Sequence, residues 1–426
     1  MEEQRRSRRD FLQNIIITLL SLSAVLLFAR TQFYDQDFLQ HFRSLTEPPV
    51  SSGSSLSLPG TALTAPVRVA VTGSYGRYGS ITLTTASEEF SPLGALLGEV
   101  LGSAQMYTAC TQEDFLDALS HPSVYYDFLT PLPLSILGEL VGAEGEDAVA
   151  ARHLVVTSPG ENRVLLYLWD HTQRFLCCTT VLSPQDLEAV IGGYEQGNAI
   201  FAFDAEEPYD EDASSLHPLS LFLPGAQPDL PVLCAESTVS GSDSLLSALG
   251  FNPHTKTRWT EGSGTEIIVD GDRTLRISTD GSLAYQSGGS GALSIESAGE
   301  IPTFREAVNG SGNLLKSLLP SGSGGELYLN GISCSAASTT LTFDYQYGGV
   351  PIRLSSGAPA ATVTLSGRAV SSILFLPRQY VPAEETALLL PMRQALAIAA
   401  QTPGTELLIG YADYGEERVC PQWLCE

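Results

Sequence analysis

The longest uninterrupted run of apolar positions lies near the start of the chain. Residues 11–28 (FLQNIIITLLSLSAVLLF) carry no charge, and a helix of that length spans about 27 Å, enough for the hydrocarbon core of a bilayer. A single Arg30 follows the run, whereas four arginines precede it: Arg5, Arg6, Arg8 and Arg9. The asymmetry predicts a cytoplasmic tail over residues 1–10, a transmembrane helix over residues 11–30 and an extracytoplasmic remainder.

A cleavable signal peptide is the alternative, because it also begins with positive charge followed by an apolar stretch. The run lacks a good small-x-small cleavage site, since Leu27 stands where a small residue before Ala29 is needed. The sequence therefore favours an anchor that is retained.

Three polar residues of this segment, Asn14, Thr18 and Ser21, recur at i, i+4 and i+7 and share one face of the predicted helix. Such residues let a partner helix approach closely and exchange hydrogen bonds within a membrane. Alternatively, Asn14 lies at headgroup depth while Thr18 and Ser21 bond their own preceding carbonyls. Both interpretations remain open.

After a Ser/Pro/Gly-rich tether over residues 31–66, the chain alternates between strand-like and helix-like patterns. Three extracytoplasmic domains are expected: an N-terminal α+β domain at 67–235, a β-meander with a helix at 236–320, and a β-sheet with a helix at 321–426. The predicted fold class is α+β, with one N-terminal transmembrane helix followed by domains of antiparallel sheets, each packed with helices.

Turn and cap signals support individual elements of this assignment. Asp270-Gly271 and Asp280-Gly281 separate three alternating segments between residues 265 and 287, which predicts a meander with tight turns. Thr111 with Asp114 is typical of a capped helix start, and a helix is expected over 111–120. Further helices are expected over 88–104, 183–193, 242–251, 303–319 and 388–401. Gly310 and Gly312 are expected to weaken the helix over 303–319.

The charge balance limits the classes of partner. Lys and Arg number 22 against 48 Asp and Glu, for a formal net charge of −26. The resulting negative field repels nucleic-acid phosphates, so nucleic acid is not expected as a partner. Five acids crowd into residues 206–215, where a solvated surface segment is favoured over a calcium site because the EF-hand spacing is absent.

Motifs that carry chemistry are scarce, and no enzyme, cofactor or metal is expected. His153 or His171 could join a serine and an aspartate in a hydrolase triad, but the many serines make any choice arbitrary. The pairs Glu88-Glu89 and Glu384-Glu385 are expected to be acids at helix starts rather than an acid–base pair. Core packing or edge placement is favoured over carbohydrate binding for Trp169, Trp259 and Trp423.

Seven cysteines, an odd number, leave at least one thiol without an intrachain disulfide partner. Cys420 and Cys425 could close a small loop, but buried thiols are the favoured interpretation for most of the seven.

Several motifs together resemble the YycH/YycI group of Firmicute membrane proteins. They are the N-terminal anchor, YYDFLTPLPLSIL, TEIIVDGDRTLRISTDGSLAYQS, FDYQYGGVPIRL, AVSSILFLPRQYV, the helix with MRQAL and the closing LLIGYADYG...VCPQW. The resemblance extends over most of the chain.

The resemblance implies an accessory regulator of a WalK-type sensor histidine kinase that acts through transmembrane and extracytoplasmic contacts. It also implies a second single-span regulator as partner, a single-pass location in the cell membrane, and no catalytic residues. The alternative function is an extracytoplasmic cell-wall hydrolase or glycan-binding module, which a deep cleft with a histidine, a serine and a carboxylate would favour.

Overall fold

The computed structural model describes most of the chain beyond residue 62. The described residues are 63, 68–81, 90–140, 149–160, 163–170, 172–225, 227–237, 243–252, 254, 256–288, 293–319, 324–335 and 337–426. All of them belong to one compact unit that begins at Leu56.

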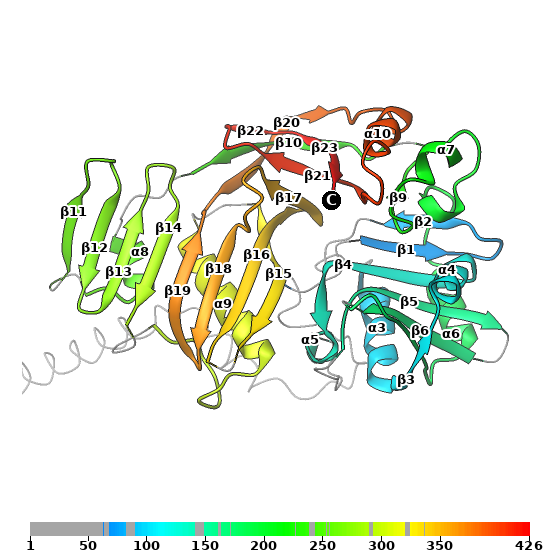
Figure 1. Ribbon diagram of the computed structural model, residues 1–426, viewed down its shortest axis with the longest axis horizontal. Coiled ribbons are helices and arrows are strands. Elements are labelled where there is room, and N and C mark those ends of the chain that lie inside the picture. Colours follow the sequence, from blue (N-terminus) through cyan, green and yellow to red (C-terminus); the bar gives the residue numbers. More distant parts are fainter. Residues whose placement is uncertain are drawn as a thin grey trace, which may run out of the picture. The chain divides into compact units, whose positions relative to one another are not determined.

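A seven-stranded antiparallel sheet forms the first half of the described chain, in the order β2-β1-β4-β5-β6-β7-β3 (Figure 1). Its strands are β1 (Arg68–Thr72), β2 (Tyr78–Ile81), β3 (Gln105–Cys110), β4 (Ser123–Pro133), β5 (Ala150–Gly160), β6 (Arg163–Asp170) and β7 (Phe175–Thr179). Strand β3 lies at one edge of this sheet, where it pairs with β7.

Helices cover both faces of this sheet. Val124 and Tyr126 of β4 belong to the same core as α3 (Ser91–Ser103) and α6 (Pro184–Ile191), while Tyr125 between them packs with α4 (Gln112–Ser120). Because alternate side chains of a strand point to opposite faces, β4 is buried along nearly its whole length. The short helix α5 (Leu134–Leu140) follows β4 directly.

The predicted helix start at Thr111 is confirmed. The Thr111 hydroxyl accepts a hydrogen bond from the Asp114 amide at 3.1 Å, and the Asp114 carboxylate accepts the Thr111 amide at 2.8 Å. This reciprocal capping satisfies backbone donors that the first helical turn leaves unpaired.

The second large sheet has eleven strands in the order β11-β12-β13-β14-β19-β18-β16-β17-β21-β23, with β15 paired to β16. The strands are β11 (Thr257–Thr260), β12 (Glu266–Asp270), β13 (Arg273–Ile277), β14 (Leu283–Ser287), β15 (Glu326–Cys334), β16 (Thr339–Tyr347), β17 (Val350–Leu354), β18 (Ala361–Ser366), β19 (Ala369–Phe375), β21 (Leu407–Asp413) and β23 (Pro421–Cys425). The meander predicted at 265–287 is confirmed, with Gly271 and Gly281 at positive φ in its turns. The pair β17 and β21 is parallel.

Helix α9 (Phe304–Leu318) packs on this sheet and runs unbroken through Gly310 and Gly312. A Cβ at Gly310 would lie 2.7 Å from Ile295 Cβ, and one at Gly312 would lie 2.3 Å from Leu63 Cδ1. The two glycines therefore permit close packing on the helix, beyond their effect on helix propensity.

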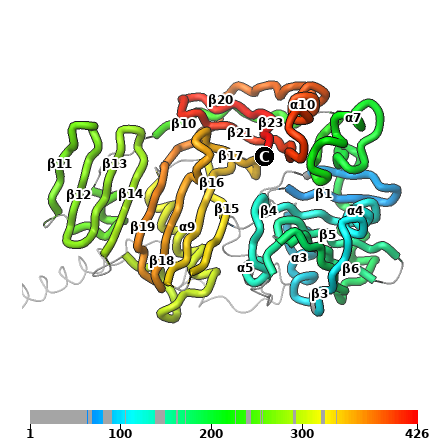
Figure 2. Tube along the Cα trace, viewed as in Figure 1, coloured from blue at the N-terminus to red at the C-terminus, as the bar shows by residue number. Residues whose placement is uncertain are grey.

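A small sheet joins segments that are far apart in sequence, in the order β20-β10-β22. Figure 2 shows green β10 beside the orange and red strands of the C-terminal region. The strands are β10 (Leu230–Glu236), β20 (Gln379–Ala387) and β22 (Arg418–Val419), and β8 (Ile200–Phe201) pairs separately with β9 (Leu221–Phe222). The described part of the chain also contains the helices η3 (Ala202–Asp204), α7 (Asp210–Ala213), α8 (Asp243–Ala248) and α10 (Met392–Ala399).

The predicted fold class is wrong, and the structure shows a mixed fold in which strand predominates over helix. Strands from the predicted middle and C-terminal domains share one sheet because β14 pairs with β19, and that sheet contains a parallel pair. No helix among the described residues has the length and apolar character needed to cross a membrane. The predicted tail and transmembrane helix, residues 1–30, lie outside the described residues.

Candidate partner-binding groove

The residues that the sequence singles out for topology and helix packing all precede the described part of the chain. They are Arg5, Arg6, Arg8, Arg9, Asn14, Thr18 and Ser21. The structure therefore brings none of them to a described site, and their roles stay predictions.

Four charged side chains meet between the first sheet and the residue before β21. The buried Asp127 accepts hydrogen bonds from Arg68 Nε at 2.9 Å and Arg152 Nε at 2.8 Å. Both arginines also pair with Glu406, and Arg152 Nη2 lies 2.7 Å from Glu406 Oε2. The two positive and two negative charges balance, so the cluster joins two parts of the fold.

The two arginines of this cluster keep the Asp127 carboxylate ionised. Burial alone would raise the pKa of Asp127, but the Arg152 and Arg68 guanidinium groups outweigh burial and hold this pKa well below its ordinary value. Because the charges are already paired with one another, the cluster has a structural role.

The structure brings one histidine of the hydrolase alternative close to a carboxylate. His153 Nδ1 lies 3.8 Å from Asp127 Oδ1, but its hydrogen bond, 2.8 Å long, is to the Tyr125 hydroxyl. Burial lowers the pKa of His153 to about 3, so the ring is neutral at neutral pH. The Tyr125 hydroxyl therefore bonds the ring nitrogen that, in a hydrolase triad, bonds the carboxylate.

A second histidine lies next to an aromatic cluster. His217 stacks on Trp169 with ring centroids 5.0 Å apart, and burial lowers its pKa. His41 and His171 lie outside the described residues.

The paired glutamates and Trp259 do not contribute to a site in the described part of the chain. Glu384 and Glu385 are exposed in strand β20, so their predicted place at a helix start is wrong, while Glu88 and Glu89 lie outside the described residues. Trp259 is 45% exposed on the edge strand β11.

The proposed loop between Cys420 and Cys425 does not match the structure. Strand β23 extends from Pro421 to Cys425. Because an extended strand rises about 3.3 Å per residue, the Cα atoms of Cys420 and Cys425 lie about 16 Å apart. A disulfide needs Cα atoms within about 7 Å, so these two thiols cannot pair in this fold.

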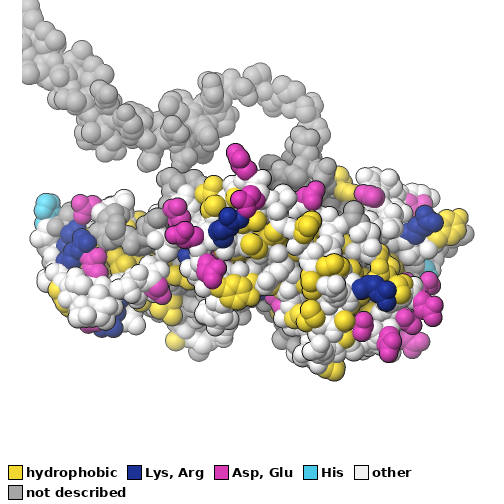
Figure 3. Space-filling model, turned by 90° about the horizontal axis from the view of Figure 1, so that it is seen from above, with side chains coloured by type: hydrophobic (Ala, Val, Ile, Leu, Met, Phe, Trp, Pro, Cys, Tyr) yellow, Lys and Arg dark blue, Asp and Glu magenta, His cyan; other side chains and the backbone are white. Residues whose placement is uncertain are grey.

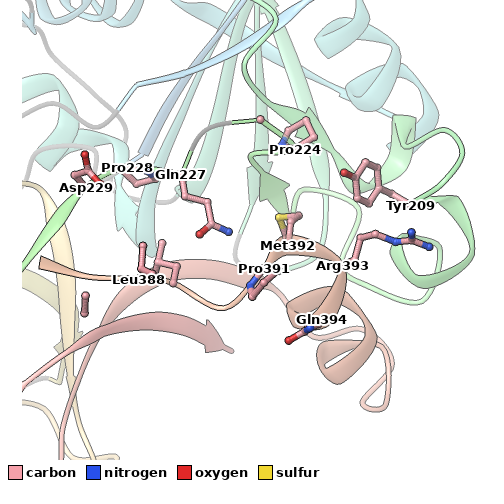
Figure 4. Close-up of a pocket in the computed structure, with 13 residues that line it drawn as sticks. Tyr209, Pro224, Gln227, Pro228, Asp229, Leu388, Pro391, Met392, Arg393 and Gln394 are labelled. Carbon is pink, nitrogen blue, oxygen red and sulfur yellow. The ribbon is translucent and has the colours of Figure 1, made fainter.

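A groove of about 740 Å³ lies at the start of helix α10. Its lining comes from two segments, residues 209–229 and residues 387–394 (Figure 4). In Figure 4, Tyr209 and Arg393 lie toward one end, Leu388 and Asp229 toward the other, and Met392 between them. A volume of this size is within the range of binding sites.

Hydrogen bonds hold Leu390, which lies between the lining residues Leu389 and Pro391. Its carbonyl accepts the Trp423 indole N–H at 2.9 Å and the Gln227 side-chain amide at 3.1 Å. Next to it, Leu389 and Met392 are buried and anchor the segment. These contacts restrict the conformation of the segment that precedes α10.

Large apolar side chains remain exposed at the groove and next to it. Leu388, which lines the groove, is 96% exposed, and the neighbouring Leu390 is 40% exposed. Neighbouring exposed aliphatic side chains mark interaction surfaces more often than isolated ones do.

The sequence pattern does not reveal the groove, because it places the run Leu388-Leu389-Leu390 inside the predicted helix over 388–401. Pro391 instead precedes the helix, which begins at Met392. A proline three residues into an apolar run was the signal that could have separated the exposed leucines from the helix.

Comparison of the chain with protein-family models, with curated proteins and with solved structures finds no match.

Proposed function

We propose that this chain is a regulatory protein that acts by binding other proteins through the groove at the start of α10. The observation that carries the proposal is the exposed Leu388 in the lining, next to Leu390, whose carbonyl accepts hydrogen bonds from Trp423 and Gln227. An exposed apolar surface that is already ordered is suited to docking, because little conformational freedom is lost on binding.

The resemblance to the YycH/YycI group supports a specific class of partner. A sensor histidine kinase is the proposed target and a second single-span regulator is a proposed companion, with the chain at the extracytoplasmic side of the cell membrane. Such a regulator shifts the kinase between two states only if it binds those states unequally.

In-cell crosslinking of the full chain followed by mass spectrometry tests this function. Recovery of a sensor kinase or of a second single-span protein is the expected result, and recovery of glycan fragments alone would contradict it. The matched variant Leu388→Ser with Leu390→Ser should lose the adduct, whereas Leu374→Ser, which alters an exposed leucine on β19, should retain it.

A further inference from the structure

Two of the seven cysteines lie on one face of neighbouring strands. In the antiparallel pair of β3 and β7, Thr108 lies opposite Cys177 and Cys110 lies opposite Phe175. Residues two apart on a strand point to the same face, so Cys110 and Cys177 are diagonal neighbours on that face. The Thr108 hydroxyl oxygen lies 3.4 Å from the Cys177 sulfur, which positions the Cys177 side chain beside β3.

The two thiols also interact directly. Burial raises the pKa of Cys110 to about 12, and the nearby Cys177 adds to this rise through its charge and a side-chain hydrogen bond. Such a bond places the two sulfur atoms close together. Both residues are thiols in the structure and are only half-buried, so a small reagent has access to them.

Strand β3 is paired irregularly at this edge of the sheet. Its register shifts between Gln105 and Thr108, where Met106 adopts a positive φ of 53° and is 86% exposed. Cys110 directly precedes Thr111, the residue that caps α4. A covalent bond at Cys110 would therefore fix both the edge strand and the start of the helix.

The irregular edge also allows the two sulfur atoms to bond. Diagonal neighbours in a regular sheet have Cα atoms about 7–8 Å apart, just beyond the range of most disulfides. Strand β3 can move by this small difference, because β7 is its only strand partner in the described sheet.

We infer that Cys110 and Cys177 form a reversible disulfide that fastens β3 and the start of α4 to β7. The co-reactant is an organic disulfide. The two thiols lose two protons and two electrons as their S–S bond forms, and the organic disulfide takes up both as its own S–S bond breaks into two thiols. This inference goes beyond the proposed function and does not depend on the groove at α10.

The raised pKa of Cys110 sets the order of the two steps. Because Cys110 is seldom ionised, the Cys177 thiolate attacks the organic disulfide first, and one organic thiol leaves. The resulting mixed disulfide carries no charge at Cys177, so Cys110 loses its proton more readily. The Cys110 thiolate then attacks the Cys177 sulfur and releases the second organic thiol.

Oxidation of the purified full chain by 2-hydroxyethyl disulfide tests the inference. This reagent is uncharged, so it is not repelled by a chain of net charge −26, on which acidic side chains outnumber basic ones over the face in Figure 3. After the remaining thiols are alkylated, mass spectrometry of the unreduced digest should show Cys110 linked to Cys177. The oxidised chain should unfold at a temperature about 5 °C higher, because the bridge closes a loop that contains β4, β5 and β6.

Serine variants locate the bridge. Cys110→Ser and Cys177→Ser should each lose the linked peptide and the rise in unfolding temperature. The matched control, Cys334→Ser, alters an exposed cysteine at the end of β15 and should retain both. Dithiothreitol should return the oxidised wild-type chain to its original unfolding temperature.

Absence of the linked peptide from the oxidised wild-type chain, or linkage of Cys110 to a different cysteine, would overturn the inference. These two results come from the wild-type chain alone, so they decide the question even if a variant fails to fold. A temperature rise that persists in Cys177→Ser, or one that dithiothreitol does not reverse, would also overturn it.

Discussion

The indole N–H of Trp423 donates to the carbonyl of Leu390 at 2.9 Å. This bond connects strand β23, near the end of the chain, with the exposed leucine segment that precedes α10. The Gln227 amide reaches the same carbonyl from the other lining segment. One backbone oxygen thus connects three parts of the sequence, which are the two lining segments and strand β23.

Substitution Trp423→Phe removes this donor and keeps most of the aromatic volume. We expect the free energy of unfolding to fall by about 1 kcal/mol, the usual contribution of one hydrogen bond. Amide hydrogen exchange at residues 388–390 should become faster, since the Leu390 carbonyl loses one of its two side-chain hydrogen bonds. Unchanged exchange there would show that Gln227 and packing suffice; a Trp259→Phe control on the edge strand β11 should leave this segment unaffected.

Substitution Asp127→Asn leaves Arg68 and Arg152 in the buried cluster with only Glu406 as a counter-charge. Breaking a buried ion pair in this way costs about 3–5 kcal/mol. Urea unfolding monitored by tryptophan fluorescence measures the loss. The exposed substitution Glu261→Gln is the control and should change stability by less than about 0.5 kcal/mol.

The stability of the fold should decrease as pH falls from 7 to 5. Burial holds the pKa of His153 at about 3, below the ordinary histidine value of about 6.5, so the unfolded chain takes up a proton that the folded chain does not. This histidine contributes a slope of about 1 kcal/mol per pH unit below pH 6.5. His217, whose pKa is also lowered, acts in the same direction.

His153→Gln should flatten that slope, whereas His254→Gln at an exposed position should not. Asp127 does not interfere in this range, because its lowered pKa affects stability only as pH falls below about 4. Identical slopes in the wild-type chain and in His153→Gln would contradict the assignment.

Gly310→Ala should destabilise the chain although alanine is the better helix former. The new Cβ would meet Ile295 Cβ at 2.7 Å, and that atom is next to the backbone and cannot rotate away. Overpacking should cost about 1–3 kcal/mol of stability. This cost should exceed the stability gained from the higher helix propensity of alanine, about 1 kcal/mol. Thermal unfolding measures the stability of Gly310→Ala. The control is Ser317→Ala, at an exposed position of the same helix. A Gly310→Ala chain more stable than the wild type would contradict the prediction.

Local signals predicted most of the individual elements. Thr111 with Asp114 marked a helix start, and the two Asp-Gly turns marked the meander, because these effects act over a few residues. Long-range pairing left no such signal. Strand β10 pairs with β20 nearly 150 residues later, and the parallel contact of β17 with β21 depends on the packing of the whole unit.

The cluster of Arg68, Asp127, Arg152 and Glu406 could not be predicted from the sequence for a related reason. Arg68, Asp127 and Arg152 stand within strands, where a charged residue predicts an exposed position. Each is partly or fully buried only because the others, with Glu406, neutralise it. Such mutual compensation depends on the tertiary arrangement and is absent from any single segment.

The most direct test of partner binding at the groove is photo-crosslinking in intact cells from a photoreactive amino acid placed at Leu388. The same group at Leu374, which is exposed on β19, provides the reference position. We predict a covalent adduct with another protein from position 388 and none from position 374. Identical adducts from the two positions, or no protein adduct from position 388, would contradict the proposed role of the groove.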